Sequence, residues 1–250
     1  MILGGAIGER LLRAVCRTHG VPSSDYENRD INLTERFGQE TLARLRGRRV
    51  LDIGCGEGRD VLELCSIGAE AFGIDIQQKS IAKARSTAQD SGARFFHASE
   101  APPWTNYFDA VISVNGFEHY SDPKRILAQM HDYLRPGGFA LISFCPPWLH
   151  PYGAHLEYMT PIPWPQLIFS ERTLMNVRKD YRSDGAGRFE EVVGGLNKMT
   201  LSKFERLLRE SLFTVRRLEY RAIKGINLFT SLPIVREFTC SVIRAELEKS

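Results

Sequence analysis

The sequence is poor in cysteine and has no cysteine pair of the kind that binds zinc or forms redox centres. Its five cysteines are odd in number and lie far apart, without a C-x-x-C spacing: Cys16, Cys55, Cys65, Cys145 and Cys240. A disulfide framework and a structural zinc site are therefore disfavoured. We expect the chain to work in a reducing compartment, which predicts a cytoplasmic location.

Net charge and long hydrophobic runs are also scarce. The 33 Lys and Arg residues against 30 Asp and Glu residues leave a net charge of +3, which is too small to predict nucleic acid as a partner without a clustered basic face. The apolar stretch from Met1 to Ile7 contains Gly4 and Gly5 and is far shorter than a membrane span. We therefore expect neither a membrane span nor a secretory signal. The oligomeric state stays open, with a homodimer as one option.

The sequence has no internal repeat or low-complexity tract, and its composition is that of a globular protein. Hydrophobic residues make up 43% and charged residues 25% of the 250 positions, which excludes a disordered or collagen-like chain. A chain of this length buries roughly three quarters of the surface that its unfolded form exposes, so it needs no disulfide or metal to hold a core. We expect a single domain over residues 1–250.

Residues 49–147 alternate short β-branched or aromatic runs with longer stretches of helical periodicity. This rhythm is typical of βαβ units on a parallel sheet. The predicted strands are Arg49–Ile53, Ala71–Ile76, Ala93–Ala98, Ala110–Val114 and Phe139–Phe144. The predicted helices are Arg59–Ser66, Gln78–Ser91 and Pro123–Leu134.

The flanking segments follow other patterns. Residues 1–48 predict a helical cover. Its two helices are predicted at Glu9–Thr18 and Thr34–Leu45, with a polar loop between them at Pro22–Asp30. Residues 148–199 are rich in proline and aromatics and lack any long strand–helix rhythm, which predicts an insertion that folds over the ligand cleft as a substrate cap. Residues 200–250 predict a closing helix and two strands, at Thr200–Ser211, Thr214–Ile223 and Phe238–Leu247.

A glycine-rich loop after the first predicted strand carries the sharpest signal. Gly54, Gly56 and Gly58 stand at alternate positions directly before a helix. Glycines here allow positive φ angles and let a ligand lie against backbone N–H groups. Asp52, at the strand end, is placed to accept hydrogen bonds from a bound cation or from the loop. Asp75, at the end of the second strand, is placed to bind both hydroxyls of a ribose.

The glycine spacing distinguishes two kinds of nucleotide cofactor. Dinucleotide sites have G-x-G-x-x-G, whereas here the third glycine comes one residue earlier. A G-x-G-x-G loop after a strand-end acid resembles the first motif of the class I S-adenosylmethionine-dependent methyltransferases. Later landmarks of that family are matched in order by Asp75, Phe108–Ser113 and Leu134–Phe139. The resemblance implies a three-layer, Rossmann-like α/β fold. Its sheet would be doubly wound, mostly parallel and seven-stranded, with an antiparallel last strand and a cap insertion after strand five.

The resemblance also implies S-adenosyl-L-methionine as cofactor and S-adenosyl-L-homocysteine as product. Where the family often has an Asp for the adenine amino group, this chain has Ala98, so adenine must be held in another way. Ser99 and Glu100 are the candidates, and Trp104 is a candidate for an added apolar contact. The expected cofactor-binding residues lie on the glycine loop and at the ends of successive strands: Asp52, Gly54, Cys55, Gly56, Gly58, Asp75, Ile76, Ser99, Glu100 and Asn115.

The stretch after the fourth predicted strand bears on the acceptor. Asn115-Gly116-Phe117-Glu118-His119 is similar to the N-x-L-E-H stretch of many small-molecule methyltransferases. Methyltransferases that act on amino groups of bases or on glutamine resemble one another in carrying D/N-P-P-Y at this place, and this chain does not have that motif. The resemblance therefore favours a small-molecule acceptor and disfavours nucleic acid.

Three histidines are candidates for the general base that methylation of a hydroxyl requires. His119 lies just past a strand end, where α/β sheets place their sites, and Glu118 beside it is placed to orient the imidazole. A capping role is the alternative for this histidine. His150 and His155 in the insertion are the competing candidates. Their spacing with Glu157 matches no helical metal-ligand pattern, so we expect no metal.

The insertion also supplies candidate substrate-binding residues, namely Trp148, Tyr152, Glu157 and Tyr158. Aromatic rings suit stacking on an acceptor, and packing within a lid is their alternative role. We expect O-methylation of a sugar, polyketide or phenolic metabolite by in-line displacement with a histidine base. The alternatives are C-methylation of a small molecule, a protein or RNA methyltransferase, and a non-catalytic relative that binds the cofactor.

Overall fold

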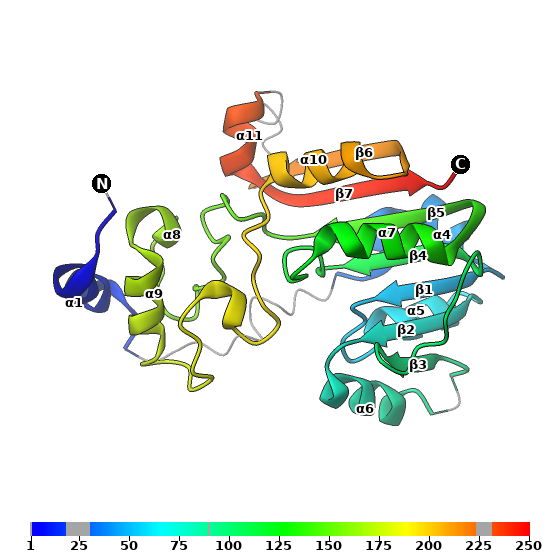
Figure 1. The fold of residues 1–250 in the computed structure, drawn as a ribbon, viewed down its shortest axis with the longest axis horizontal. Coiled ribbons are helices and arrows are strands. Elements are labelled where there is room, and N and C mark those ends of the chain that lie inside the picture. The colour runs from blue at the N-terminus through cyan, green and yellow to red at the C-terminus, as the bar shows by residue number, and fades with distance from the viewer. Residues whose placement is uncertain (1, 19–30, 90, 224–231) are drawn as a thin grey trace.

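Seven strands form one mixed sheet (Figure 1). The computed structural model describes residues 2–18, 31–89, 91–223 and 232–250. The strands are β1 (Arg49–Ile53), β2 (Glu70–Asp75), β3 (Arg94–His97), β4 (Phe108–Val114), β5 (Leu134–Phe144), β6 (Thr214–Ala222) and β7 (Cys240–Glu248), in the spatial order β3-β2-β1-β4-β5-β7-β6. The first five strands run parallel, and β7 is antiparallel to both its neighbours. The predicted doubly wound sheet with an antiparallel last strand is therefore confirmed.

Helices cover both faces of the sheet, and each face has its own apolar core. The first face carries α3 (Leu33–Phe37), α4 (Gln39–Ala43), α5 (Arg59–Ser66) and α6 (Gln78–Thr87). The second face carries α7 (Pro123–Tyr133) and α10 (Leu201–Glu210). Side chains alternate between the two cores along each strand, so that Val50 belongs to the first core and Leu51 and Ile53 to the second. Burial on both faces explains why these strands are almost continuously apolar.

Polar side chains fix where the helices on the second face begin. Asp122 Oδ1 accepts a hydrogen bond from the backbone N–H of Arg125 at 3.0 Å, and Pro123 occupies the first turn of α7. Thr200 Oγ1 accepts in the same way from the backbone N–H of Lys203 at 3.1 Å, at the start of α10. Each cap satisfies a backbone donor that the helix itself leaves unpaired.

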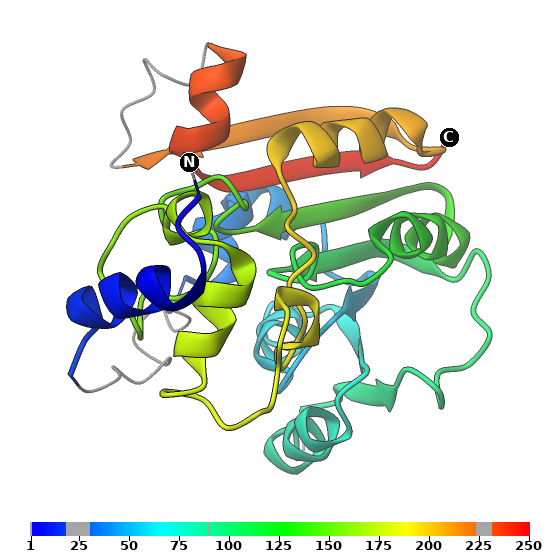
Figure 2. The same cartoon turned by 60° about the vertical axis from the view of Figure 1, so that its left-hand side comes forward.

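The insertion after β5 folds into a cap with an apolar core separate from those of the sheet. It contains α8 (Pro165–Ile168), α9 (Glu171–Arg178) and a short 3₁₀ helix. The N-terminal helix α1 (Gly5–Val15) packs against α9 (Figure 2), and both lie to one side of the sheet (Figure 1). A backbone bridge between Leu3 and Phe169 ties the two segments together. The cap is therefore built from two segments that are far apart in the sequence.

Some predicted helix boundaries were wrong. The helix predicted over Thr34–Leu45 is two short helices, because Gly38 has a φ of 88° and ends the first one. The first helix begins and ends earlier than the predicted Glu9–Thr18, and α6 ends before the predicted Ser91. The polar loop predicted at Pro22–Asp30 lies outside the described residues.

The C-terminal part contains a helix that the sequence reading missed. Helix α11 (Pro233–Thr239) precedes β7, so the strand predicted to start at Phe238 starts at Cys240 instead.

Within the described part of the chain, no helix is long and apolar enough to cross a bilayer.

Candidate active site

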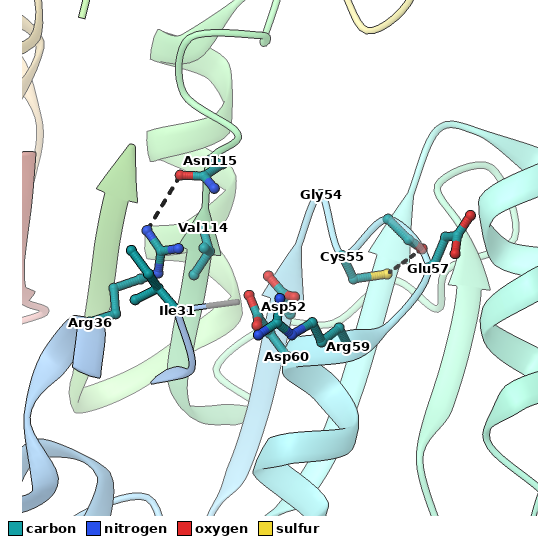
Figure 3. A pocket seen from close by; sticks show the side chains of 11 residues that line it. Ile31, Arg36, Asp52, Gly54, Cys55, Glu57, Arg59, Asp60, Val114 and Asn115 are labelled. Carbon is teal, nitrogen blue, oxygen red and sulfur yellow. Dashed lines mark hydrogen bonds between the residues drawn. The ribbon is translucent and has the colours of Figure 1, made fainter. Parts of the chain in front are cut away.

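A cavity of about 180 Å³ lies between the carboxyl ends of β1 and β4 (Figure 3). The chain leaves β1 toward β2 on one side and leaves β4 toward β5 on the other, so this is the point where the strand order reverses. Open α/β sheets bind their ligands at such a crevice. The lining comes from the glycine loop, the start of α5, the end of β4 and the segment around α3.

The glycine loop adopts the backbone conformation that its sequence predicts. Gly54, Gly56 and Gly58 have φ values of 79°, 52° and 85°, a region that other residues occupy only with strain. A Cβ on Gly58 would lie 2.5 Å from the ring of Phe95, and one on Gly54 would lie 2.8 Å from the hydroxyl of Tyr120. Both steric space and backbone angle therefore require glycine at these two positions.

Asp75 connects the end of β2 to this loop. Its Oδ2 accepts a hydrogen bond from the Gly56 backbone N–H at 2.9 Å, and its Oδ1 accepts one from the Gln77 backbone N–H at 2.7 Å. Each carboxylate oxygen keeps a further lone pair for a ligand. The side chain of Ile76 next to it is 76% exposed, which offers an apolar surface beside the carboxylate.

Acidic side chains dominate the floor of the cavity. Asp52 is 2% exposed, and its Oδ1 has no hydrogen-bond partner among the described residues. Burial raises the pKa of Asp52 well above its usual range, and repulsion from Asp60 and Asp75 adds to the effect. Burial raises the pKa of Asp60 as well. A ligand that brings positive charge would favour the ionised forms of these two carboxyls.

Arg36 is a cavity residue that the sequence reading missed. It is 6% exposed, and its Nη1 donates to Ser143 Oγ at 3.3 Å and, weakly, to Asn115 Oδ1 at 3.4 Å. Its Nε has no partner among the described residues. Figure 3 shows the guanidinium across the cavity from the acids, where it can bind a ligand carboxylate. The only sequence signal near it was the N-cap residue Asn32, which accepts from the Glu35 N–H at 2.8 Å and starts α3.

A contact with the cap sets the tautomer of neutral His119, which lies on the turn after β4. Its Nδ1 lies 2.6 Å from the carbonyl oxygen of Gly195. A carbonyl can only accept, so Nδ1 donates, and in the neutral ring Nε2 is left with a free lone pair. The neighbouring Glu118 is 3% exposed, and neither of its carboxylate oxygens has a hydrogen-bond partner among the described residues. Burial raises the pKa of Glu118, while the attraction of His119 acts against this.

The structure brings His119 and His155 together but gives His150 a different environment. The rings of His119 and His155 pack edge to face with centroids 5.7 Å apart, and Nε2 of His155 is buried without a partner among the described residues. In His150, Nδ1 accepts from the Tyr152 N–H at 3.1 Å, so Nε2 holds the proton and donates to Ser241 Oγ at 3.3 Å. Burial lowers the pKa of both His150 and His155 to about 4. Both are therefore neutral near pH 7.

The predicted adenine contacts lie outside the lining of the cavity. Ser99 Oγ is hydrogen-bonded to His97 Nδ1 at 2.7 Å, and Glu100 forms an ion pair with Arg85 at 3.1 Å. The ring of Trp104 packs edge to face on Phe108 at 5.0 Å, at the amino end of β4 and so opposite the glycine loop. Of the predicted cofactor residues, the cavity is lined by Asp52, Gly54, Cys55, Gly56 and Asn115.

The four predicted substrate-binding residues belong to the cap and do not line the cavity. Trp148 packs edge to face on Phe189 at 5.0 Å, and the ring of Tyr152 lies 6.0 Å from that of His150. Glu157 accepts from Arg17 through its carbonyl oxygen, and Tyr158 lies under the guanidinium of Arg182. Among the residues that the structure describes, no group of three or more His, Cys, Asp or Glu is placed to hold a metal ion.

Comparison with known proteins shows which family the central part of the chain resembles. Residues 50–138 match the family described as a methyltransferase domain. The ubiquinone biosynthesis O-methyltransferase of Aromatoleum aromaticum is 37% identical over 106 residues, which cover 40% of this chain and 45% of that protein. The enzyme of the same name from Thiobacillus denitrificans is 30% identical over 128 residues, which cover 49% and 55%. The chain thus spans about half the length of the curated relatives that it matches.

Solved structures share the fold over most of the chain. An S-adenosylmethionine-dependent methyltransferase from Mesorhizobium loti aligns with a TM-score of 0.58 and 19% identity, covering 88% of this chain and 99% of that one. The [4+2]-cyclase SpnF aligns with a TM-score of 0.54 and 18% identity, covering 96% and 91%. The second name shows that this fold alone does not determine the reaction. Residues 50–138 are thus similar to a methyltransferase domain, and most of the chain shares its fold with S-adenosylmethionine-dependent methyltransferases.

Proposed function

We propose that this protein transfers a methyl group from S-adenosyl-L-methionine to a hydroxyl oxygen of a small molecule, with His119 as the general base. The observation that carries this proposal is the 2.6 Å hydrogen bond from His119 Nδ1 to the Gly195 carbonyl. It leaves the Nε2 lone pair free to take a proton, on a turn that follows the cavity residue Asn115.

The charges of the cavity support S-adenosylmethionine as the ligand. Asp75 suits the two ribose hydroxyls, and the N–H groups of the glycine loop suit close contact with the ligand. Asp52 and Asp60 favour the positive charges of the amino and sulfonium groups, and Arg36 suits the carboxylate. When bound, this ligand supplies a methyl group on an already activated sulfur.

The chain's own residues then have three tasks in the reaction. The glycine loop and Asp75 orient the donor for in-line attack. We expect the cap, which is hydrogen-bonded to the turn after β4, to exclude water during the reaction and so to protect the donor from hydrolysis. His119 takes the proton of the acceptor hydroxyl, a contribution worth about 10²- to 10⁴-fold in rate.

The names of two relatives support one class of acceptor. Two similar proteins are named ubiquinone biosynthesis O-methyltransferase, which supports a phenolic hydroxyl among the three acceptor classes that the sequence left open.

Two measurements test this function. Isothermal titration calorimetry should show binding of S-adenosylhomocysteine by the full chain and weaker binding by Asp75→Ala. A methyl-transfer assay over a panel of catechols and phenols should show activity that falls by about 10²-fold or more in His119→Ala. His131→Gln on α7 is the control histidine. Lack of binding to either form of the cofactor would refute the enzyme proposal.

Methylation of carbon is the second candidate. It is supported by the position of His150, whose two ring nitrogens are both engaged within the protein. An activated carbon acceptor needs less of a base. Activity that survives in the combined variant His119→Ala, His150→Ala and His155→Ala would favour this candidate over O-methylation.

A further inference from the structure

The last part of the cap is clamped onto the turn that follows β4. The side-chain amide of Asn197 donates to the carbonyl oxygens of Phe117 and Tyr120, both at 2.7 Å. Its backbone N–H donates to the carbonyl oxygen of Glu118 at 2.9 Å. One cap residue thus binds three backbone carbonyls of a single turn, and that turn carries His119.

The same cap segment supplies the partner of the histidine. Gly195, two positions before Asn197, accepts from His119 Nδ1 at 2.6 Å. Gly195 has a φ of 70°, and a Cβ on it would lie 3.1 Å from the His119 carbonyl oxygen, so the two backbones approach closely. The place of the Gly195 carbonyl therefore depends on how firmly Asn197 holds the segment to the turn.

We propose that Asn197 is a positioning residue for methyl transfer. By holding the Gly195 carbonyl against Nδ1, it keeps the proton of neutral His119 on Nδ1 and the lone pair on Nε2. The other neutral form has its proton on Nε2 and cannot act as a base from that atom. This inference rests on the proposed function, in which Nε2 takes the hydroxyl proton.

The chemistry of the contact requires an amide at this position. Both N–H groups of Asn197 point at carbonyl oxygens, and its Oδ1 is buried without a partner among the described residues. Aspartate has the same shape but only acceptor atoms when ionised. Asn197→Asp would set a carboxylate against two carbonyl oxygens, whereas Asn197→Ala only removes the donors.

Gln166 provides a matched control in another part of the cap. Its side-chain amide also donates to two carbonyl oxygens, those of Trp148 at 2.8 Å and His150 at 3.0 Å, and its Oε1 is also buried without a described partner. Gln166→Ala therefore removes the same kind and number of bonds without touching the turn of His119. Lys203→Met is a milder change to the contact between Asn197 and the turn of His119, because Lys203 Nζ donates to the Asn197 carbonyl oxygen at 2.9 Å.

The test is long-range ¹H–¹⁵N correlation NMR on the full chain labelled with ¹⁵N-histidine, with the His119 signals assigned by His119→Gln. We expect a protonated Nδ1 and a bare Nε2 in the wild type and in Gln166→Ala. Asn197→Ala should show a mixture of both neutral forms, and Lys203→Met a smaller shift in the same direction. In a methyl-transfer assay, kcat of Asn197→Ala should fall by about tenfold or more, while its affinity for S-adenosylhomocysteine stays within about twofold of the wild type.

The outcomes separate this inference from the proposed function. A wild-type His119 protonated on Nε2, or a tautomer unchanged in both Asn197→Ala and Lys203→Met, would overturn the positioning role even if methyl transfer is measured. If the tautomer shifts as expected but the wild type transfers no methyl group to any hydroxyl, the proposed function fails and the positioning of His119 stands as a structural fact. Equal tautomer shifts in Gln166→Ala would also overturn the proposal, because they would reflect general loosening of the cap.

Discussion

Gly58 has a φ of 85° at the start of α5, and a Cβ there would lie 2.5 Å from the ring of Phe95. We expect Gly58→Ala to lower the free energy of unfolding by about 2–4 kcal/mol, because the left-handed backbone and the overpacking both cost energy. Gly137 is the control: it has a φ of 71° but open space around its Cβ position, so Gly137→Ala should lose only about 1–2 kcal/mol. Urea denaturation of both variants measures the difference, and equal losses would contradict the steric argument.

Asp52 should couple cofactor binding to proton release. Its pKa is raised by burial and by repulsion from Asp60 and Asp75, so Asp52 in the empty cavity holds its proton to a higher pH than an exposed Asp, and a cationic ligand favours release of that proton. We expect binding of S-adenosylmethionine to release protons in the pH range where Asp52 titrates, which calorimetry from pH 5 to 8 in two buffers of different ionisation enthalpy measures. Asp52→Asn should lose most of this release. The same release in the variant would assign the proton to another group.

At the scale of residues, the sequence predicts the glycines that the local backbone requires. It does not predict side-chain contacts between distant segments. The glycines of the loop follow from their spacing and from the positive φ that the loop needs. Arg36 and Asn115 are separated by 79 positions, and His119 and Gly195 by 76. No local pattern encodes such contacts, because they depend on how α3 and the cap pack on the sheet.

At the scale of elements, α3 matters because it carries Arg36 into the cavity. Its N-cap Asn32 accepts from the Glu35 N–H at 2.8 Å, so Asn32→Ala should destabilise the protein by about 1 kcal/mol. We also expect it to weaken binding of S-adenosylmethionine, since a frayed α3 no longer fixes the guanidinium. Ser170→Ala, which removes the equivalent cap of α9, should cost similar stability with unchanged cofactor affinity. Calorimetry and thermal denaturation of the pair test this, and equal affinities would show that α3 does not position Arg36.

Helices and strands were predicted correctly where the hydrophobic periodicity of a segment and its amino-acid composition indicate the same element. The strands from β1 to β5 are runs of β-branched and aromatic residues between turn signals, and their order and direction follow from the βαβ rhythm. The prediction failed at Gly38, because the helical periodicity continues across the break while the backbone does not. It also missed α8 and α11, which start at Pro165 and Pro233; proline there fits a first helical turn but equally well a loop.

At the scale of the whole molecule, the cap is held together by contacts that cross the sequence. Leu12 of α1 is completely buried with Leu174 and Met175 of α9, and Arg13 forms an ion pair with Asp180 at 2.8 Å. The sequence predicted an insertion over the cleft but assigned the N-terminal helices to a separate cover. A helix with one apolar stripe does not specify which distant stripe it meets, so this pairing could not be predicted from periodicity.

The cap should also make the stability of the molecule depend on pH. Burial lowers the pKa of His150 from 6.5 to about 4, so below pH 6.5 the unfolded chain binds a proton that the folded cap does not. Stability is then complete above pH 6.5 and falls as the pH drops toward 4, by about 2–3 kcal/mol for this group at pH 4.5. The raised pKa values of Asp52 and Glu118 change the stability in the opposite direction on acidification. The pH dependence of the wild type's free energy of unfolding therefore does not report on His150 alone. The difference between the wild type and His150→Asn isolates the histidine: urea denaturation from pH 7.5 to 4.5 should show the variant losing less stability on acidification. Parallel curves for the two proteins would mean that His150 is protonated in the folded cap, and that the cap opens to water at this position.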